Sequence, residues 1–222
     1  MLKNIFIKIS EFFNHILDFV LPLRSDYEIV ESLDEETIYS LPKGRKVEDN
    51  DWIHPLFDYK NKKVKAVIWE LKYRENILSL GTIGKMLFDE MLEIMSDIIL
   101  FDAKAEFDII PIPITVKSRS ERGYNQSELI CRAIIENDSE RTLLYAPQWF
   151  EKIKETPKQS LSQSKIDRTE NLVGCFEADE RIAGKYVFII DDVVTTGSTL
   201  NEAKKTLLGV GAVNVFGFTI AH

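Results

Sequence analysis

Apolar side chains recur at near-helical spacing in the first twenty residues. They are Ile5, Phe6, Ile9, Phe12, Phe13, Ile16, Leu17 and Val20. Charged residues such as Lys8, Glu11 and Asp18 interrupt this run, so it has neither a signal-peptide core nor a bilayer-spanning length. We expect a helix that either docks its apolar face on the domain or lies on a membrane surface.

A polar segment follows, and after it come two segments whose apolar residues recur at helical spacing. Asp26 to Asp51 is polar and acidic with turn signals, which predicts irregular structure with room for short strands. Apolar residues then recur at i, i+3, i+4 and i+7 from Val64, which predicts a helix over Lys62 to Glu75. A more apolar helix is expected from about Leu80 to Leu100.

From Phe107 onward the pattern is typical of an α/β domain. Phe107 to Ile114 predicts a strand, and Thr115 to Tyr124 predicts a polar loop. Asn125 can cap a following helix, with Glu128 three residues on as in a capping box. Glu155 to Gln163 is polar and contains a proline, which predicts a mobile loop.

The C-terminal third predicts a strand, a loop, a helix and a second strand. Tyr186 to Ile190 is continuously apolar, as in a strand buried on both faces. A helical face follows from Leu200 and ends near Gly209, and Val213 to Ile220 predicts the last strand. This succession favours a parallel sheet flanked by helices.

Composition and charge narrow the function classes. The net charge of -8 argues against binding nucleic acid through bulk charge, although a local basic patch remains open. The two cysteines, Cys131 and Cys175, are too few for a disulfide scaffold or a zinc site of four thiolates. We therefore expect a protein of the reducing cytoplasm.

The clearest chemical signal is the run Val187 to Thr199. Thr195 to Thr199 leads into a predicted helix N-terminus, where free N–H groups and the positive end of the helix dipole favour an anion. Four hydroxyl side chains add donors, and Gly197 lets the backbone approach closely. These features predict a phosphate site.

Two carboxylates, Asp191 and Asp192, precede this loop and would repel an anion that they faced. The conflict disappears if they accept hydrogen bonds from vicinal hydroxyls of the same ligand, as in a ribose 5-phosphate. The alternatives are a solvated acidic turn and a Thr-Ser run that only caps a helix.

The run Val187 to Thr199 resembles the thirteen-residue signature of type I phosphoribosyltransferases. More of the chain, from about Asp58 to the C-terminus, is similar to the ComF/GntX-like family of competence-associated phosphoribosyltransferase-like proteins. The similar pieces are Leu71–Tyr73, Ile110–Pro113, Arg119, Arg122–Gln126, Thr156–Gln159, Arg168, Asn171, Gly174 and Phe176. We expect residues 1–57 to form a small N-terminal helical and irregular appendage, and residues 58–222 to form the phosphoribosyltransferase-like domain.

The resemblance implies roles for individual positions. Asp191 and Asp192 would hold the ribose hydroxyls at the catalytic centre. The 5-phosphate would be held by Thr195, Thr196, Gly197, Ser198 and Thr199. Pyrophosphate would lie at the loop that contains Lys117, Arg119, Arg122 and Gly123. A lid would include Lys158, Gln159 and Arg168. A solvated basic loop and an ordinary surface connection remain the alternatives for the last two groups.

The resemblance also bears on metals. Magnesium would arrive with phosphoribosyl pyrophosphate and would need no direct protein ligand. Relatives commonly carry a cysteine-rich zinc module near the N-terminus, but Leu23 to His54 contains no cysteine, which argues against structural zinc.

Three functions stay open. The first is a phosphoribosyltransferase whose acceptor the sequence does not identify. The second is a competence protein that handles single-stranded DNA with a helicase partner, for which Lys43 to Lys46 and Lys60 to Lys65 supply basic residues and Tyr73 and Tyr124 supply stacking rings. The third is a regulator that senses phosphoribosyl pyrophosphate without turnover.

Overall fold

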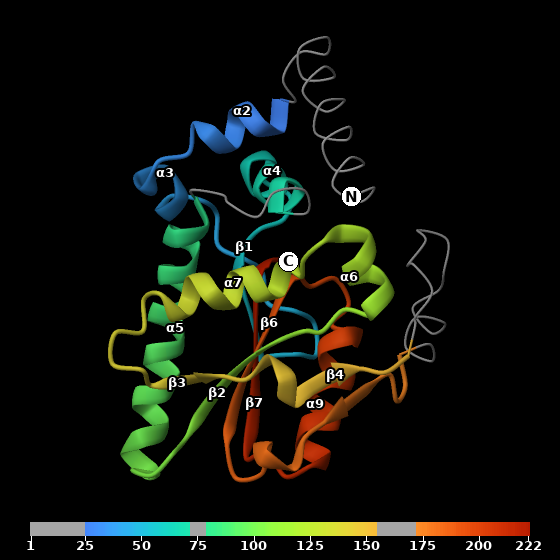
Figure 1. Cartoon of the computed structure of the whole chain (residues 1–222). Coiled ribbons are helices and arrows are strands. Elements are labelled where there is room, and N and C mark those ends of the chain that lie inside the picture. The colour runs from blue at the N-terminus through green and yellow to red at the C-terminus, as the bar shows by residue number, and fades with distance from the viewer. Residues whose placement is uncertain (1–24, 72–78, 155–171) are drawn as a thin grey trace, which may run out of the picture.

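A five-stranded parallel sheet forms the centre of the protein (Figure 1). The computed structural model describes residues 25–71, 79–154 and 172–222. The strand order is β1-β7-β6-β2-β3, and every neighbouring pair is parallel. The strands are β1 (Ile53–Phe57), β2 (Phe107–Pro111), β3 (Leu143–Tyr145), β6 (Tyr186–Val193) and β7 (Asn214–Ala221).

Both faces of the sheet are covered. One face packs on α4 (Lys62–Leu71), α5 (Ser79–Phe101) and α7 (Gln126–Ile135), with α2 (Ser25–Glu31) and α3 (Glu35–Tyr39) beyond them. The other face packs on α9 (Ser198–Gly209) and on an antiparallel pair, β4 (Phe150–Lys152) and β5 (Phe176–Ala178). Short 3-10 turns lie at Pro147–Trp149 and Glu180–Ile182.

Strand β6 explains why the sheet is covered twice. Phe188 and Ile190 belong to the core under α5 and α7, whereas Val187 and Ile189 belong to the core under α9. Successive side chains of a strand point to opposite faces, so a continuous apolar run needs a cover on each. The predicted buried strand and the predicted parallel sheet flanked by helices are confirmed.

The expectation of irregular structure between Asp26 and Asp51 was partly wrong. Helices α2 and α3 occupy its first half, and the Asp34 carboxylate caps α3 by accepting from the Thr37 N–H at 2.8 Å. Val30 and Ile38 are buried in the core, which stabilises helices too short to show a periodic pattern. Strand β1 joins the central sheet beside β7, while the predicted division at residue 57 stays a prediction. The predicted helix of residues 1–20 lies outside the described residues.

The predicted polar loop after β2 was also wrong. Residues Val116–Arg122 form helix α6, because Thr115 accepts from the Ser118 N–H at 3.2 Å and Gly123, with a φ of 89°, ends the helix. The predicted cap of the next helix is confirmed, since the Asn125 side chain accepts from the Ser127 N–H at 3.1 Å.

The connections between strands define where a ligand could bind. Strand β2 leads through α6 and α7 to β3, whereas β6 leads through α9 to β7 on the other side. The chain therefore leaves two neighbouring strands, β2 and β6, in opposite directions at their carboxyl ends. Open α/β sheets bind ligands at such a switch point. Within the described ranges, no helix is long and apolar enough to cross a membrane.

Candidate functional site

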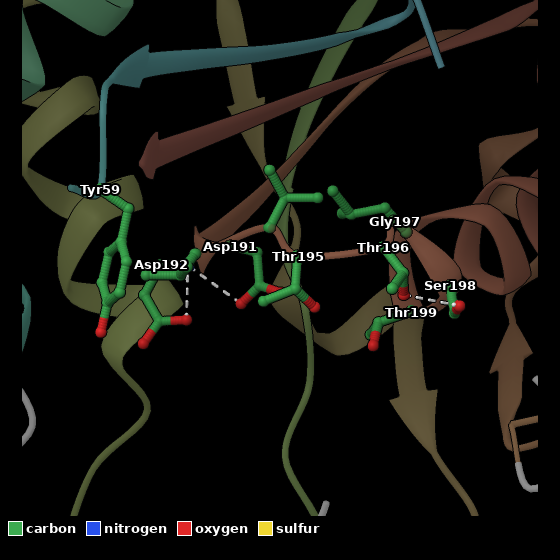
Figure 2. A pocket seen from close by; sticks show the side chains of 11 residues that line it. Tyr59, Asp191, Asp192, Thr195, Thr196, Gly197, Ser198 and Thr199 are labelled. Atoms are coloured by element: carbon green, nitrogen blue, oxygen red, sulfur yellow. Dashed lines mark hydrogen bonds between the residues drawn. The ribbon is translucent and has the colours of Figure 1, made fainter. Parts of the chain in front are cut away.

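A cavity of about 270 Å³ lies at the carboxyl end of β6. The unbroken run 191–200 lines it, together with Tyr59 from the turn after β1 (Figure 2). Figure 2 shows Tyr59 and Asp192 at one end of the cavity, and Thr196, Ser198 and Thr199 at the other. The acidic pair, Asp191 and Asp192, and the hydroxyl-rich loop, Thr195 to Thr199, were predicted from sequence to bind one ligand. Both line this one cavity.

The hydroxyl-rich end is built on the N-terminus of α9. Gly197 precedes the helix with a φ of 75°, the left-handed conformation that favours glycine. A Cβ atom there would lie 3.3 Å from both Asn50 Nδ2 and Ile53 Cδ1, so the position is also close-packed. The Thr196 and Ser198 hydroxyls form a hydrogen bond with each other at 2.9 Å, which places both groups side by side at the positive end of the helix dipole.

The acidic end is held by local hydrogen bonds. The Asp191 carboxylate accepts from the Asp192 N–H at 2.9 Å and from the Ser127 hydroxyl at 3.2 Å. The Asp192 carboxylate accepts from the Val193 N–H at 2.8 Å. Burial, and then the charge of Asp192, raise the pKa of Asp191 well above its usual range. A group that donates hydrogen bonds to these carboxylates would relieve that unfavourable charge.

Ser127 is a site residue that the sequence analysis missed. It lies in the first turn of α7, whose cap residue Asn125 also donates to the Ile112 carbonyl oxygen at 2.9 Å. This bond fixes the start of α7 to the end of β2, the strand next to β6. The cap signal was visible in the sequence, but the neighbour of Ser127 across the sheet was not.

Tyr59 is the second residue that was missed. Its side chain lines the same cavity as Asp191 and Asp192 (Figure 2), although Asp191 follows Tyr59 by 132 positions in the sequence. A single tyrosine after a strand belongs to no motif, so only the pairing of β1 with β7 reveals its position.

The predicted pyrophosphate residues lie on α6 and at its end. Arg119 forms an ion pair with Glu128, Lys117 is exposed, and Gly123 ends the helix. Helix α6 follows the carboxyl end of β2, the end of the sheet that carries the cavity, but these three residues do not line the cavity. The side chain of Arg122 and the lid residues Lys158, Gln159 and Arg168 lie outside the described part of the chain. Both roles stay predictions.

Of the two tyrosines predicted to stack on single-stranded DNA, Tyr124 lies within the described residues and Tyr73 does not. The Tyr124 hydroxyl donates to the Leu71 carbonyl oxygen at 3.1 Å, which ties the start of α7 to the end of α4. Tyr73 lies outside the described residues.

A larger cavity, of about 490 Å³, lies at the opposite edge of the sheet. Asp108 and Lys185 line it, with the Lys185 ammonium 3.4 Å from a fully buried Asp108 carboxylate. Burial raises the pKa of Asp108 to about 6, although Lys185 opposes the shift. This edge holds the amino ends of β2, β3 and β6, which are not where parallel sheets bind ligands. The smaller cavity is therefore the better candidate site.

Comparisons with known proteins agree with this choice. The family model described as "Phosphoribosyl transferase domain" matches residues 148–219, which include β6, the hydroxyl-rich loop and α9. The "DNA utilization protein YhgH" of Shigella flexneri is 32% identical over 112 residues, which cover 48% of this chain and 45% of that protein. Its counterpart in Salmonella typhimurium is 26% identical over 174 residues, covering 78% and 70%.

A third relative carries a competence name. "Competence protein F" of Haemophilus influenzae is 32% identical over 127 residues, covering 51% of this chain and 50% of that protein. The chain spans about half the length of the Shigella and Haemophilus relatives. Among solved structures, the glutamine phosphoribosylpyrophosphate amidotransferase from B. subtilis matches 69% of this chain and 30% of its own, at 18% identity and a TM-score of 0.42. The named relatives and the domain match together support a similarity of this chain to ComF-like, phosphoribosyltransferase-like proteins.

Proposed function

We propose that this protein binds phosphoribosyl pyrophosphate or a related ribose 5-phosphate ligand. One observation supports the proposal above the others: a single cavity joins the acidic pair Asp191 and Asp192 to the hydroxyl-rich loop at the start of α9. Neither half alone would define the ligand. Together they fit a molecule with a phosphate at one end and two neighbouring hydroxyl groups beside it.

The loop supplies the attraction for the phosphate. Thr195, Thr196, Ser198 and Thr199 provide hydroxyl donors, and the first turn of α9 provides N–H donors. A charge-assisted hydrogen bond is worth roughly 1.5–3 kcal/mol, so two or three suffice for a useful affinity.

The acidic pair would distinguish a ligand that carries both phosphate and a ribose diol from one that carries phosphate alone. Ionisation of Asp191 beside Asp192 is unfavourable, and hydrogen bonds from the ribose 2- and 3-hydroxyls would stabilise the ionised form of both carboxyl groups. A ligand that brings phosphate without the diol would leave that charge uncompensated.

Magnesium would enter on the pyrophosphate and would neutralise its charge. The two carboxylates are the hard oxygen groups that suit the water shell of magnesium, so the donor chemistry fits. If the bound group is transferred, this chain's contribution would be to hold the two ends of the ligand in place. Release of pyrophosphate with one nucleobase and not with others would establish the transferase.

The diol can be tested directly with paired ligands. We expect ribose 5-phosphate to raise the melting temperature more than 2-deoxyribose 5-phosphate or inorganic phosphate at the same concentration. Loss of one charge-assisted hydrogen bond should weaken binding by about tenfold or more. Equal stabilisation by the ribose and deoxyribose ligands would refute the role of the acidic pair.

A second candidate function, binding of single-stranded DNA, rests on a different surface. Arg45 forms an ion pair with Asp58 at 3.3 Å, which brings the basic run at residues 43–46 next to the one at residues 60–65. Curated relatives carry the names "DNA utilization protein" and "Competence protein", and a helicase would be a suitable partner. Affinity that falls with salt and survives Asp191→Asn/Asp192→Asn would support this function. Affinity that the acidic pair controls would contradict it.

A third candidate, a sensor of phosphoribosyl pyrophosphate, needs the same binding site without turnover. Tight binding of the ligand with no pyrophosphate release in the presence of any nucleobase would favour the sensor over the transferase.

A further inference from the structure

The hydroxyl-rich loop is packed from behind by a segment that lies outside the cavity. This segment, residues 47–53, leads into β1, and we call it the buttress. A Cβ atom at Gly197 would lie 3.3 Å from the side chains of both Asn50 and Ile53. Neither of these residues lines the cavity, so the chemistry proposed for phosphate and diol gives the buttress no task.

The first half of the buttress is a tight turn. The Asn50 N–H donates to the Val47 carbonyl oxygen at 3.0 Å, and the turn between them places Asp49 at a φ of 58°. Aspartate tolerates this left-handed conformation better than most residues do. Val47 is buried in the core under α9, and Asn50 is buried as well. The turn is therefore anchored by packing and presents Asn50 to the interior of the protein.

The Asn50 side chain has a partner for each end of its amide. Its Nδ2 donates to the Glu48 carbonyl oxygen at 2.8 Å, and its Oδ1 accepts from the Trp52 Nε1 at 3.3 Å. A buried polar group whose hydrogen bonds are made is held in one orientation. The amide that packs against Gly197 is thus fixed by the buttress itself.

Trp52 gives the buttress a second contact with α9. The Lys204 ammonium lies 4.3 Å from the centre of the Trp52 ring, within cation–π reach. The Gly217 N–H of β7 donates to the Trp52 carbonyl oxygen at 2.9 Å. Lys204 follows Gly197 by about two turns of helix. The buttress therefore contacts α9 at its cap and about two turns further on, and it ties both points to the central sheet.

We propose that Asn50 is a positioning residue, which holds Gly197 and the first turn of α9 in the geometry that binds phosphate. This inference rests on the proposed binding of the ribose 5-phosphate group and adds a residue, outside the loop, that prepares the loop. A loop that is already ordered binds its ligand more tightly, because the conformational entropy is lost on folding and not on binding.

The test compares a loss of affinity with a loss of stability. Asn50→Ala removes the amide behind Gly197. We expect its affinity for inorganic phosphate and for ribose 5-phosphate to fall by the same factor, about fivefold to tenfold, because freeing one backbone residue has an effect of that order. Calorimetry measures both affinities at a temperature where circular dichroism shows that the variant is folded.

Asn137→Ala is the matched control. The Asn137 Nδ2 also donates to a backbone carbonyl oxygen, that of Ala133, at 2.8 Å, but it lies beyond the C-terminal end of α7 and does not line the cavity. This control should lower the melting temperature and leave both affinities unchanged. A residue that only supports the fold would behave like Asn137.

Trp52→Phe is a milder variant, which keeps an aromatic ring next to Lys204 but removes the Nε1–H that donates to Asn50. It should weaken ribose 5-phosphate by a smaller factor, about twofold to threefold. If Asn50→Ala does not fold, this variant decides, and an unchanged affinity in it refutes the positioning role.

The remaining outcomes separate the positioning role from the proposed function. If wild type binds ribose 5-phosphate and Asn50→Ala binds it equally well, the positioning role is refuted and the proposed function stands. If Asn50→Ala weakens ribose 5-phosphate but not inorganic phosphate, Asn50 acts on the diol and not on the loop, which also refutes the role. If wild type binds neither ligand, the proposed function itself fails and the positioning role fails with it.

Discussion

Replacement of Ser127 by alanine should change how ligand binding depends on pH. The Ser127 hydroxyl donates to the Asp191 carboxylate at 3.2 Å and thereby stabilises the ionised form. Only that form accepts hydrogen bonds on both oxygens from a ribose diol. Loss of the hydroxyl should therefore raise the pKa of Asp191 further and weaken binding in the range where the carboxyl becomes protonated.

The size of the effect follows from the geometry. A hydrogen bond to a charged group contributes roughly 1.5–3 kcal/mol, and this one is longer than the usual range for hydroxyl donors. The lower figure applies, and since 1.36 kcal/mol corresponds to one pKa unit, we expect the pKa of Asp191 to rise by about one unit. Affinity for ribose 5-phosphate should fall about tenfold at pH values below both midpoints and should be unchanged above them.

The same substitution should also change how stability depends on pH. The folded pKa of Asp191 lies above the unfolded value of about 3.9, so the ionised carboxyl costs stability. Stability is then greatest below the unfolded pKa and falls as pH rises toward the folded pKa. In the Ser127→Ala variant, this fall should extend to a higher pH.

Calorimetric titration with ribose 5-phosphate measures the effect, over a pH range that extends above the midpoint of the variant, about one unit higher than the wild-type pKa of about 8. The control is Ser96→Ala, which removes an exposed hydroxyl of α5 that bonds only to its own helix. An unchanged midpoint in Ser127→Ala would refute the link between Ser127 and the Asp191 charge. An equal loss of affinity at every pH would also refute it, because the hydroxyl would then act on the ligand or the fold and not on the proton.

Three further predictions concern other parts of the protein. Gly197→Ala should lower the free energy of unfolding by about 1–2 kcal/mol in urea titrations, because the residue must keep a φ of 75°; unchanged stability would contradict this. Lys185→Met should destabilise the fold by about 3–5 kcal/mol at pH 8, since it leaves the buried Asp108 charge without its partner. Adding Asp108→Asn should restore most of that loss, and a double variant as unstable as the single one would refute the pairing. Arg119→Ala should weaken phosphoribosyl pyrophosphate more than ribose 5-phosphate in calorimetry, whereas equal weakening would place Arg119 away from the pyrophosphate.

Much of the sheet could be predicted from local patterns. The apolar run of β6 and the helical face of α9 are strong periodic signals, and the order strand, loop, helix, strand leaves few topologies open. The hydroxyl-rich loop was visible for the same reason, since all its residues are consecutive in the chain. Strand β6 continues to Val193, beyond the predicted end at Ile190. Asp191 and Asp192 therefore lie inside the strand, near its carboxyl end, and not after it.

Short capped helices could not be predicted in the same way. Helix α6 spans only Val116–Arg122 and is mainly polar, so its cap residues were the only signal that it gave. Helices α2, with 7 residues, and α3, with 5 residues, are also short and depend on burial of a few apolar residues against α4 and α5. Packing stabilises such elements more than local propensity does.

The site residues that were missed share one property: their neighbours are distant in sequence. Ser127 reaches Asp191 because β2 pairs with β6, and Tyr59 reaches the cavity because β1 pairs with β7. Strand order decides both contacts, and hydrophobic periodicity does not specify strand order. A motif search therefore finds the consecutive loop but not the residues that complete the cavity.

Titration of magnesium phosphoribosyl pyrophosphate by calorimetry is the most direct test of the proposed site. The wild-type chain and an Asp191→Asn/Asp192→Asn variant should be compared, with circular dichroism to confirm that both are folded. The joined acidic and hydroxyl-rich ends of the cavity predict saturable binding by wild type and affinity at least about tenfold lower in the variant. Undetectable binding by wild type at millimolar ligand, or equal binding by the two proteins, would contradict it.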